Sequence, residues 1–177
     1  MPVHQPEWKD ACAVIGEVVL LYTALDTQLN HIVIEVMHLN QSPMLETVIA
    51  TLDPRQKTEI LKSRAKHIRQ KDWQKGLRTH ADRLERVARI RNAVCHAPLI
   101  PSNAKGSFEF APSAATKILK NMTFTDSKSY SLDRMTIDQV REIIPLAEKA
   151  LGGGENILAN FAKIRSALEQ KKSRAMT

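Results

Sequence analysis

The sequence predicts an all-α fold: a bundle of four to five helices, with an irregular loop or a short β-hairpin at about residues 98–134. Three observations predict this fold. Apolar residues recur every three or four positions along the long segments, as they do on one face of a helix. Several segments open with a capping residue that is followed by proline, or by glutamine three positions later. The connections between most of these segments are short, as in helical bundles.

Each expected helix has local sequence features that predict where it begins or ends. The first is the longest, because roughly nine turns pass without an interior proline. Ser42 and Asp53 are expected to cap the second and third helices, and Pro98 ends the fourth. Pro145 and the glycines at 152–154 are expected to kink or split the last helix. The expected helices span about residues 7–39, 43–49, 54–70, 72–96 and 136–172.

Length and composition indicate one soluble domain over residues 1–177, with its core at about 7–172. A chain of 177 residues buries roughly 70% of its surface on folding, so it needs no metal or disulfide support. No run of about 18 apolar residues and no secretory signal are found, which predicts a cytoplasmic protein without a membrane span. Two cysteines are too few for a four-cysteine zinc site, and neither a metal nor a cofactor is expected.

The net charge of +7 is unevenly distributed along the chain. Residues 1–54 carry a net charge of −6, residues 55–91 carry +9, and residues 92–177 carry +4. A concentrated positive charge attracts polyanions, nucleic acid first. A basic helix face that is only solvated, or that pairs with the acidic first segment, would produce the same pattern. The basic residues considered as RNA phosphate contacts are Lys57, Arg64, Arg69, Arg78 and Arg83.

Two charged residues stand where apolar residues are expected. Arg91 lies in the middle of the apolar stripe of the fourth helix, seven residues after Leu84 and fourteen after Leu77. A guanidinium that faces a core is unfavourable unless an anion meets it. Asp26 lies within the apolar stripe of the first helix, so we expect it to hold Arg91 as a buried ion pair. A pair with a purely structural role is the alternative.

The hexapeptide Arg91-Asn92-Ala93-Val94-Cys95-His96 resembles the signature of the HEPN superfamily. That signature consists of an arginine, a polar residue that is often asparagine, and a histidine four to six residues after the arginine, near the end of a bundle helix. The acid in the first helix, the basic middle helix, the variable loop and the closing helix extend the resemblance over roughly residues 7–172. No subfamily is assigned.

The resemblance implies a metal-independent endoribonuclease that forms a homodimer, with the two motifs facing each other across a shared cleft. In this chain Arg91 would bind the scissile phosphate, Asn92 would orient it, and His96 would transfer protons. The 2′-hydroxyl of RNA is the nucleophile in such a reaction, so neither a metal nor a nucleophilic side chain is needed. Histidine suits the proton transfers, and a fixed guanidinium stabilises charge on the phosphorane. The expected products carry a 2′,3′-cyclic phosphate and a 5′-hydroxyl.

Three functions are compatible with these residues. The first is a ribonuclease that acts on RNA as a toxin or in phage defence, with a cognate antitoxin such as a nucleotidyltransferase as a partner. The second is a catalytically inactive HEPN dimer that binds nucleic acid or protein. The third is a plain interaction bundle in which the Arg91–Asp26 pair only sets helix register. The complete set of Arg91, Asn92 and His96 favours the ribonuclease, because a scaffold does not need all three.

Overall fold

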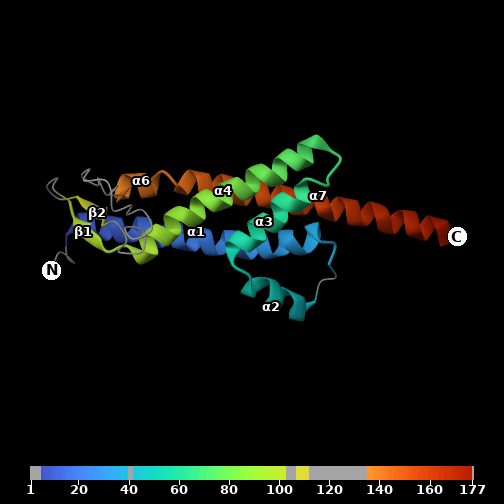
Figure 1. Cartoon of the computed structure of the whole chain (residues 1–177), viewed down its shortest axis with the longest axis horizontal. Coiled ribbons are helices and arrows are strands. Elements are labelled where there is room, and N and C mark those ends of the chain that lie inside the picture. Colours follow the sequence, from blue (N-terminus) through green and yellow to red (C-terminus); the bar gives the residue numbers. More distant parts are fainter. Residues whose placement is uncertain (1–4, 40–41, 103–106, 112–134, 177) are drawn as a thin grey trace, which may run out of the picture.

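The computed structural model describes residues 5–39, 42–102, 107–111 and 135–176 (Figure 1). Most of these residues are helical, which confirms the predicted all-α fold with a short β-hairpin. The helices are α1 (Pro6–Val36), α2 (Pro43–Thr51), α3 (Pro54–Ala65), α4 (Lys71–His96), α6 (Ile137–Arg141) and α7 (Ile144–Met176). The strands are β1 (Leu99–Pro101), β2 (Phe108–Phe110) and β3 (Met135–Thr136).

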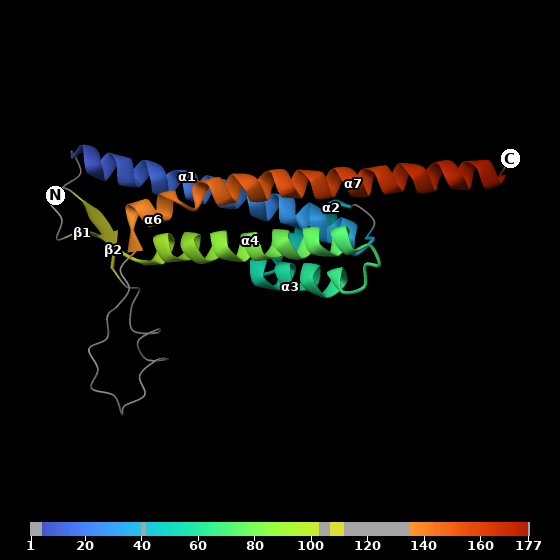
Figure 2. The same cartoon turned by 90° about the horizontal axis from the view of Figure 1, so that it is seen from above.

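Three long helices, α1, α4 and α7, run alongside one another and enclose the core (Figures 1 and 2). Leu25, Leu29 and Val87 are among the core side chains with almost no exposed surface. The short helix α3 packs on α4 and α1, and α2 packs on α1. The C-terminal half of α7 extends past the ends of its neighbours (Figure 2).

A small antiparallel sheet follows the end of α4. Ile100 of β1 pairs with Glu109 of β2, and Phe110 of β2 pairs with Met135 of β3. The ring of Phe108 meets the Trp8 ring edge-on at 5.3 Å, which joins the sheet to the first turns of α1. The short β-hairpin expected at about residues 98–134 is therefore confirmed by the pairing of β1 with β2. Residues 103–106 and 112–134 of that segment lie outside the described residues.

The predicted helix starts are confirmed by their caps. The Leu45 amide donates to the Ser42 hydroxyl at 3.2 Å at the start of α2. Asp53 opens α3 with a complete capping box, and Thr136 opens α6 with another. Each cap satisfies backbone N–H groups that have no partner within the helix, which explains why these boundaries can be read from local sequence. The end of α3 was predicted less well: the helix ends at Ala65, five residues before the expected end at residue 70.

The last helix splits beside Pro145, one of the two places expected, and not at its glycines. It separates into α6 and α7 around Glu142 and Ile143, because Pro145 lacks an N–H group and cannot continue the preceding helix. The glycines at 152–154 instead lie inside a continuous α7. A side chain at Gly154 would overlap the amide of Gln28, which donates from Nε2 to the Leu151 carbonyl at 3.0 Å. Glycine there allows α1 and α7 to approach closely.

Among the described helices, α1 has the length and hydropathy that a membrane-crossing helix requires. Its most apolar 18-residue window has a mean hydropathy of 1.4, and 28% of that window is buried within the bundle. Core helices of bundles satisfy the same criterion, so this property is weak support for a membrane span.

His80 lies between α4 and α7 with 2% of its surface exposed. The pKa of its imidazole is lowered to about 4, mainly by burial and also by the nearby Arg83 guanidinium, although a hydrogen bond to the Ala150 backbone acts in the opposite direction. Neither ring nitrogen makes a hydrogen bond of good geometry with the described residues. The folded bundle therefore holds a neutral histidine.

We expect the bundle to lose stability in mild acid through His80. Its pKa is about 4 when folded and 6.5 when unfolded, so the unfolded chain binds more protons between these values. Above pH 6.5 the neutral His80 leaves the free energy of unfolding at its full value. Between pH 6.5 and pH 4 that free energy falls by about 1.4 kcal/mol per pH unit. Urea unfolding of wild type and His80→Leu at about pH 7 and about pH 5 measures the effect. If wild type and His80→Leu lost the same unfolding free energy between the two pH values, the prediction would be contradicted.

Candidate functional site

Arg91 lies on the side of α4 that faces α1, as its place in the apolar stripe predicts. Its guanidinium carbon is 5.1 Å from the centre of the Tyr22 ring, a cation–π arrangement that favours a partly buried cation. Its Nη1 donates to the Asn92 Oδ1 at 3.0 Å. Its Nε is buried and has no acceptor among the described residues. The guanidinium is thus held in place while it retains an unused donor.

The predicted Asp26–Arg91 ion pair is wrong. Asp26 Oδ1 instead accepts from Lys57 Nζ of α3 at 2.9 Å. The Lys57 side chain is completely buried, whereas 30% of the Asp26 side chain is exposed. The physical reason is the position of α3, which packs across α1 and brings a lysine to the carboxylate from a different helix. A buried ammonium needs such a partner more strongly than a guanidinium that rests on an aromatic ring.

Tyr22 connects these two charged groups. Burial raises the pKa of its phenol, and the Asp26 carboxylate raises it further, while Arg91 acts in the opposite direction. The phenol is therefore neutral at physiological pH, and its ring offers a π-face to Arg91 rather than a negative charge.

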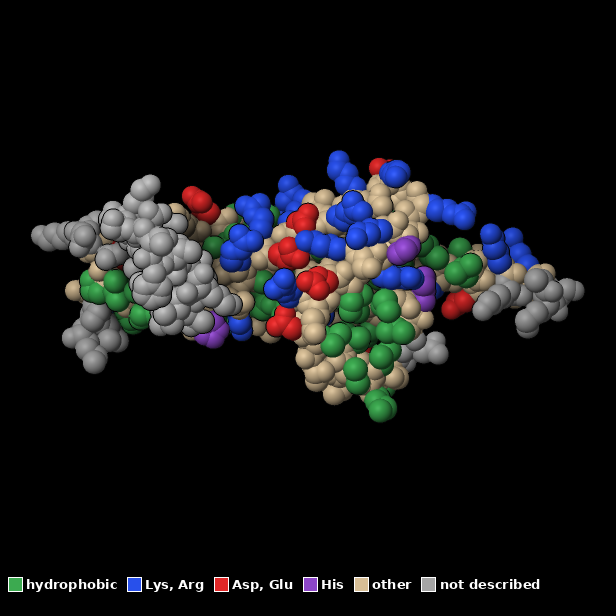
Figure 3. Space-filling view, viewed as in Figure 1, with side chains coloured by type: hydrophobic (Ala, Val, Ile, Leu, Met, Phe, Trp, Pro, Cys, Tyr) green, Lys and Arg blue, Asp and Glu red, His purple; other side chains and the backbone are tan. Residues whose placement is uncertain are grey.

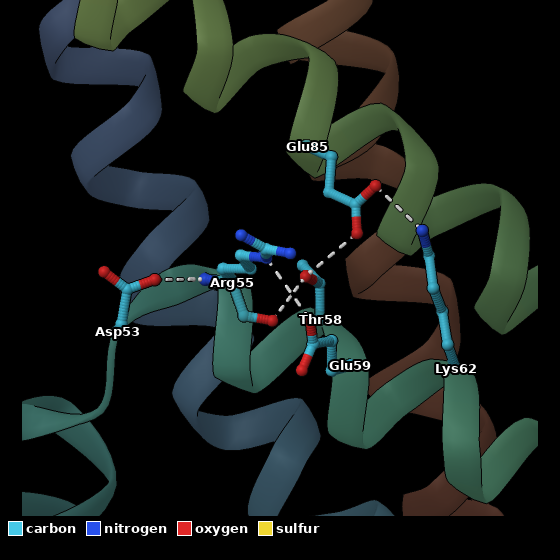
Figure 4. Close-up of polar contacts among 6 residues, drawn as sticks. All are labelled: Asp53, Arg55, Thr58, Glu59, Lys62 and Glu85. Atoms are coloured by element: carbon cyan, nitrogen blue, oxygen red, sulfur yellow. Dashed lines mark hydrogen bonds and ion pairs between the residues drawn. The ribbon is translucent and has the colours of Figure 1, made fainter. Parts of the chain in front are cut away.

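A groove of about 820 Å³ lies between α1, α3 and α4. Tyr22, Asp26, Arg91 and Asn92 line one part of it, beside Arg89. Figure 4 shows the polar residues of the α3 side and its neighbour Glu85 on α4. The groove therefore brings together three of the predicted site residues, namely Arg91, Asn92 and the supporting Asp26.

Most charges on the α3 side of the groove neutralise one another (Figure 4). Lys62 Nζ lies 2.8 Å from both an Asp82 and a Glu85 carboxylate oxygen, and these hydrogen bonds raise the pKa of the lysine. Arg55 Nε pairs with Glu59 at 3.3 Å. By contrast, Arg89 and Arg91 have no carboxylate partner among the described residues.

His96 lies apart from Arg91, although it follows Asn92 by four residues and shares that flank of α4. It is exposed at the last residue of α4 and does not line the groove. Five residues along a helix correspond to a rotation of about 140°, so the imidazole and the guanidinium point in different directions. One copy of the chain thus places Arg91 and Asn92 in the groove, but not His96.

The five basic residues proposed as RNA contacts have different environments. Lys57 is fully buried against Asp26 and cannot reach a phosphate at the surface. Arg64 is half-buried and donates from Nε to the Val36 carbonyl at 3.2 Å. Arg83 is half-buried beside Gly153. Arg69 and Arg78 are exposed, so they are the two whose positions suit the predicted role.

The cations on one face of α4 form a row, of which only Arg78 was proposed as an RNA contact from the sequence. Its members are exposed, have no ion pair among the described residues, and lie within about 80° of one another around the helix. Basic side chains gather over this part of the surface in Figure 3. The signal available in the sequence was the helical spacing of these cations. We call them the α4 cation row: Lys71, Lys75, Arg78, Arg86 and Arg89.

No family model, curated protein or solved structure matches this chain. Within the described residues, no group of three or more histidine, cysteine, aspartate or glutamate side chains could hold a metal ion.

Proposed function

We propose that the chain is a metal-independent endoribonuclease of the HEPN type, which cleaves RNA as a cytoplasmic homodimer. The observation that carries this proposal is Arg91, a cation held on the Tyr22 ring at a groove, with no carboxylate partner among the described residues. Such a group suits a phosphate. The α4 cation row supports the proposal, because it extends the positive surface toward one long polyanion.

Catalysis in this proposal needs a second copy of the chain. Arg91 and Asn92 bind the scissile phosphate of RNA. The 2′-hydroxyl attacks the phosphorus and displaces the 5′-oxygen of the next nucleotide, which leaves as a 5′-hydroxyl. His96 of the other copy transfers the protons, because His96 of the same copy lies outside the groove. A twofold-symmetric contact supplies this arrangement twice. A role as a toxin or in phage defence, with a cognate antitoxin such as a nucleotidyltransferase, belongs to the same proposal.

Arg91→Ala is expected to weaken RNA binding by about tenfold or more, because a charge-assisted hydrogen bond contributes about 1.5–3 kcal/mol. The dependence of affinity on salt should also become shallower by about one ion per site. Arg55→Ala is the matched control, since Arg55 lines the same groove but pairs with Glu59. Filter binding at several salt concentrations measures both quantities. Equal effects of the two substitutions would exclude Arg91 as the phosphate ligand.

Cleavage itself is tested with RNA in excess EDTA and with a substrate that carries a 2′-deoxy nucleotide at the cut site. Activity should persist in EDTA and vanish on the deoxy substrate. Loss of activity in EDTA that Mg²⁺ restores would disprove the metal-independent mechanism, as would normal cleavage of the deoxy substrate.

A non-catalytic nucleic-acid-binding module is the second candidate. The exposed position of His96 outside the groove favours it, because binding requires Arg91 and the cation row but no acid–base group. Saturable RNA binding that depends on Arg91, with no cleavage of any RNA by the dimer, would select this function over the first.

A further inference from the structure

The last helix, α7, extends beyond the ends of α1 and α4 (Figure 2). Near the end of the bundle, the Phe161 ring of α7 meets the Trp73 ring of α4 edge-on, with their centres 5.6 Å apart. One turn further on, Arg165 Nη1 pairs with a Glu35 carboxylate oxygen of α1 at 2.6 Å. Helix α1 ends one residue after Glu35, and α4 begins two residues before Trp73. We call the part of α7 at residues 162–176 the α7 extension.

The apolar stripe that packs α7 into the bundle continues along the α7 extension. Its residues follow one another in steps of three and four, the heptad spacing of helices that pack side by side. They are Ala147, Ala150, Gly154, Ile157, Phe161, Ile164 and Leu168. Ala147 is fully buried and Phe161 is 8% exposed, whereas Ile164 is 41% and Leu168 is 54% exposed. The stripe thus keeps the spacing of a packed helix after the described helices that cover it have ended.

An uncovered stripe on a projecting helix is unfavourable in water. Ile164 and Leu168 lie one turn apart on the same face, so they form a contiguous apolar surface and are not apolar residues scattered singly. A helix of about 15 residues without tertiary contacts is also marginally stable, because most helical stability in proteins comes from packing of the apolar face. A partner that covers this face would therefore stabilise the α7 extension as well as bury its apolar side chains.

The charge of the α7 extension indicates the chemistry of that partner. Residues 162–176 contain five lysines and arginines and one acidic residue, which gives a net charge of +4. Arg165 and Arg174 lie on opposite sides of the stripe, roughly 80–100° from its centre, and Lys171 takes the heptad position after Leu168. A second copy docked through the same stripe would place two segments of equal positive charge together, which opposes the contact. An acidic helix has the complementary charge.

We propose that the α7 extension binds an amphipathic helix of a partner protein, in which acidic residues flank an apolar heptad stripe. The partner's stripe covers Ile164 and Leu168, and its carboxylates meet the basic residues of the extension. The extension is about 22 Å long, or two heptads, so the contact is small and reversible. The inference does not rest on the proposed RNA function, because the extension leaves the bundle where α4 begins, whereas His96 is the last residue of α4.

The test is titration of the full chain against a fluorescent synthetic helix of three heptads, measured by fluorescence anisotropy. The probe has leucine at the two apolar positions of each heptad and glutamate at the two positions that flank them, where mutual repulsion keeps probe molecules apart. A matched probe carries lysine in place of glutamate. The glutamate probe is expected to bind saturably, with a Kd in roughly the micromolar to millimolar range, and the lysine probe at least about tenfold more weakly. Equal binding of the two probes, or no saturable binding of the glutamate probe, would overturn the proposal.

Two aspartate variants separate the stripe from the overall charge of the extension. Leu168→Asp should weaken binding of the glutamate probe by about tenfold or more, because it removes a leucine that the partner buries. Ser166→Asp is the matched control: it adds the same charge about 160° away around the helix, so it should change the affinity much less. Both positions are exposed, so neither substitution disturbs the core of the bundle. Equal effects of the two variants would exclude the stripe as the contact surface.

Two other occupants of the stripe would give different results. If a second copy covered it, sedimentation would show a smaller assembly for Leu168→Asp than for wild type or Ser166→Asp. If a membrane covered it, vesicles of phosphatidylcholine and phosphatidylserine would bind wild type but not Leu168→Asp. Either result would overturn the acidic helix as the occupant. Arg91→Ala should bind the glutamate probe as wild type does, so failure of the proposed RNA function and failure of this surface are distinguishable.

Discussion

Replacement of His96 by alanine is expected to lower the turnover of RNA cleavage by about 10²- to 10⁴-fold, the usual contribution of a positioned acid–base group. RNA affinity should change little, because Arg91 and the α4 cation row supply the phosphate contacts in this proposal. Single-turnover cleavage and equilibrium binding, measured on the same RNA, separate the two effects. His31→Ala, at an exposed histidine of α1, is the matched control and should retain full activity.

A mixture of His96→Ala with Arg91→Ala tests whether each active site is shared between two copies of the chain. Arg91→Ala and His96→Ala are each expected to be inactive, but their mixture should regain about a quarter of wild-type activity. The reason is statistical: half of the dimers would be mixed, and one of their two sites would contain both intact residues. No recovery in a mixture that is shown to exchange subunits would exclude a site built from Arg91 of one copy and His96 of the other.

Replacement of Lys57 by alanine or Asp26 by asparagine is expected to change stability more than any surface substitution. Lys57 is fully buried, so removal of Asp26 leaves an uncompensated ammonium in the bundle, and removal of Lys57 leaves a carboxylate without its partner. Breaking such a pair costs about 3–5 kcal/mol. For a chain of 177 residues this corresponds to a drop in Tm of roughly 10 °C. Thermal and urea unfolding measure it.

Two control variants separate the effect of the buried Lys57–Asp26 pair from the effect of removing any charged side chain. Arg55→Ala breaks an exposed pair with Glu59 and should change stability by less than about 1 kcal/mol. The double variant Asp26→Leu, Lys57→Met removes both charges and should recover most of the stability that either single change loses. Single variants as stable as Arg55→Ala would show that the Lys57–Asp26 pair does not hold α3 against α1.

The helices themselves were largely predictable from local sequence. Caps at Ser42, Asp53 and Thr136 act within three residues, and the apolar periodicity of α1 and α4 repeats within a turn or two. Pro145 also acts locally, but the sequence alone did not show whether the last helix would break there or at the glycines at 152–154. Those glycines are tolerated inside a helix because at least one of them meets Gln28 of α1, a contact between residues far apart in the chain.

The sequence by itself determined the helical class, most helix boundaries and the unusual position of Arg91 in an apolar stripe. Only the tertiary structure decided that Asp26 bonds Lys57, that Arg91 rests on Tyr22, and that His96 lies outside the groove. Helix formation depends on hydrogen bonds between residues four apart, so its signals are short-range. The partner of a buried charge depends on how two helices rotate and align against each other. Lys57 therefore resembled any other lysine of a basic helix until α3 was placed against α1.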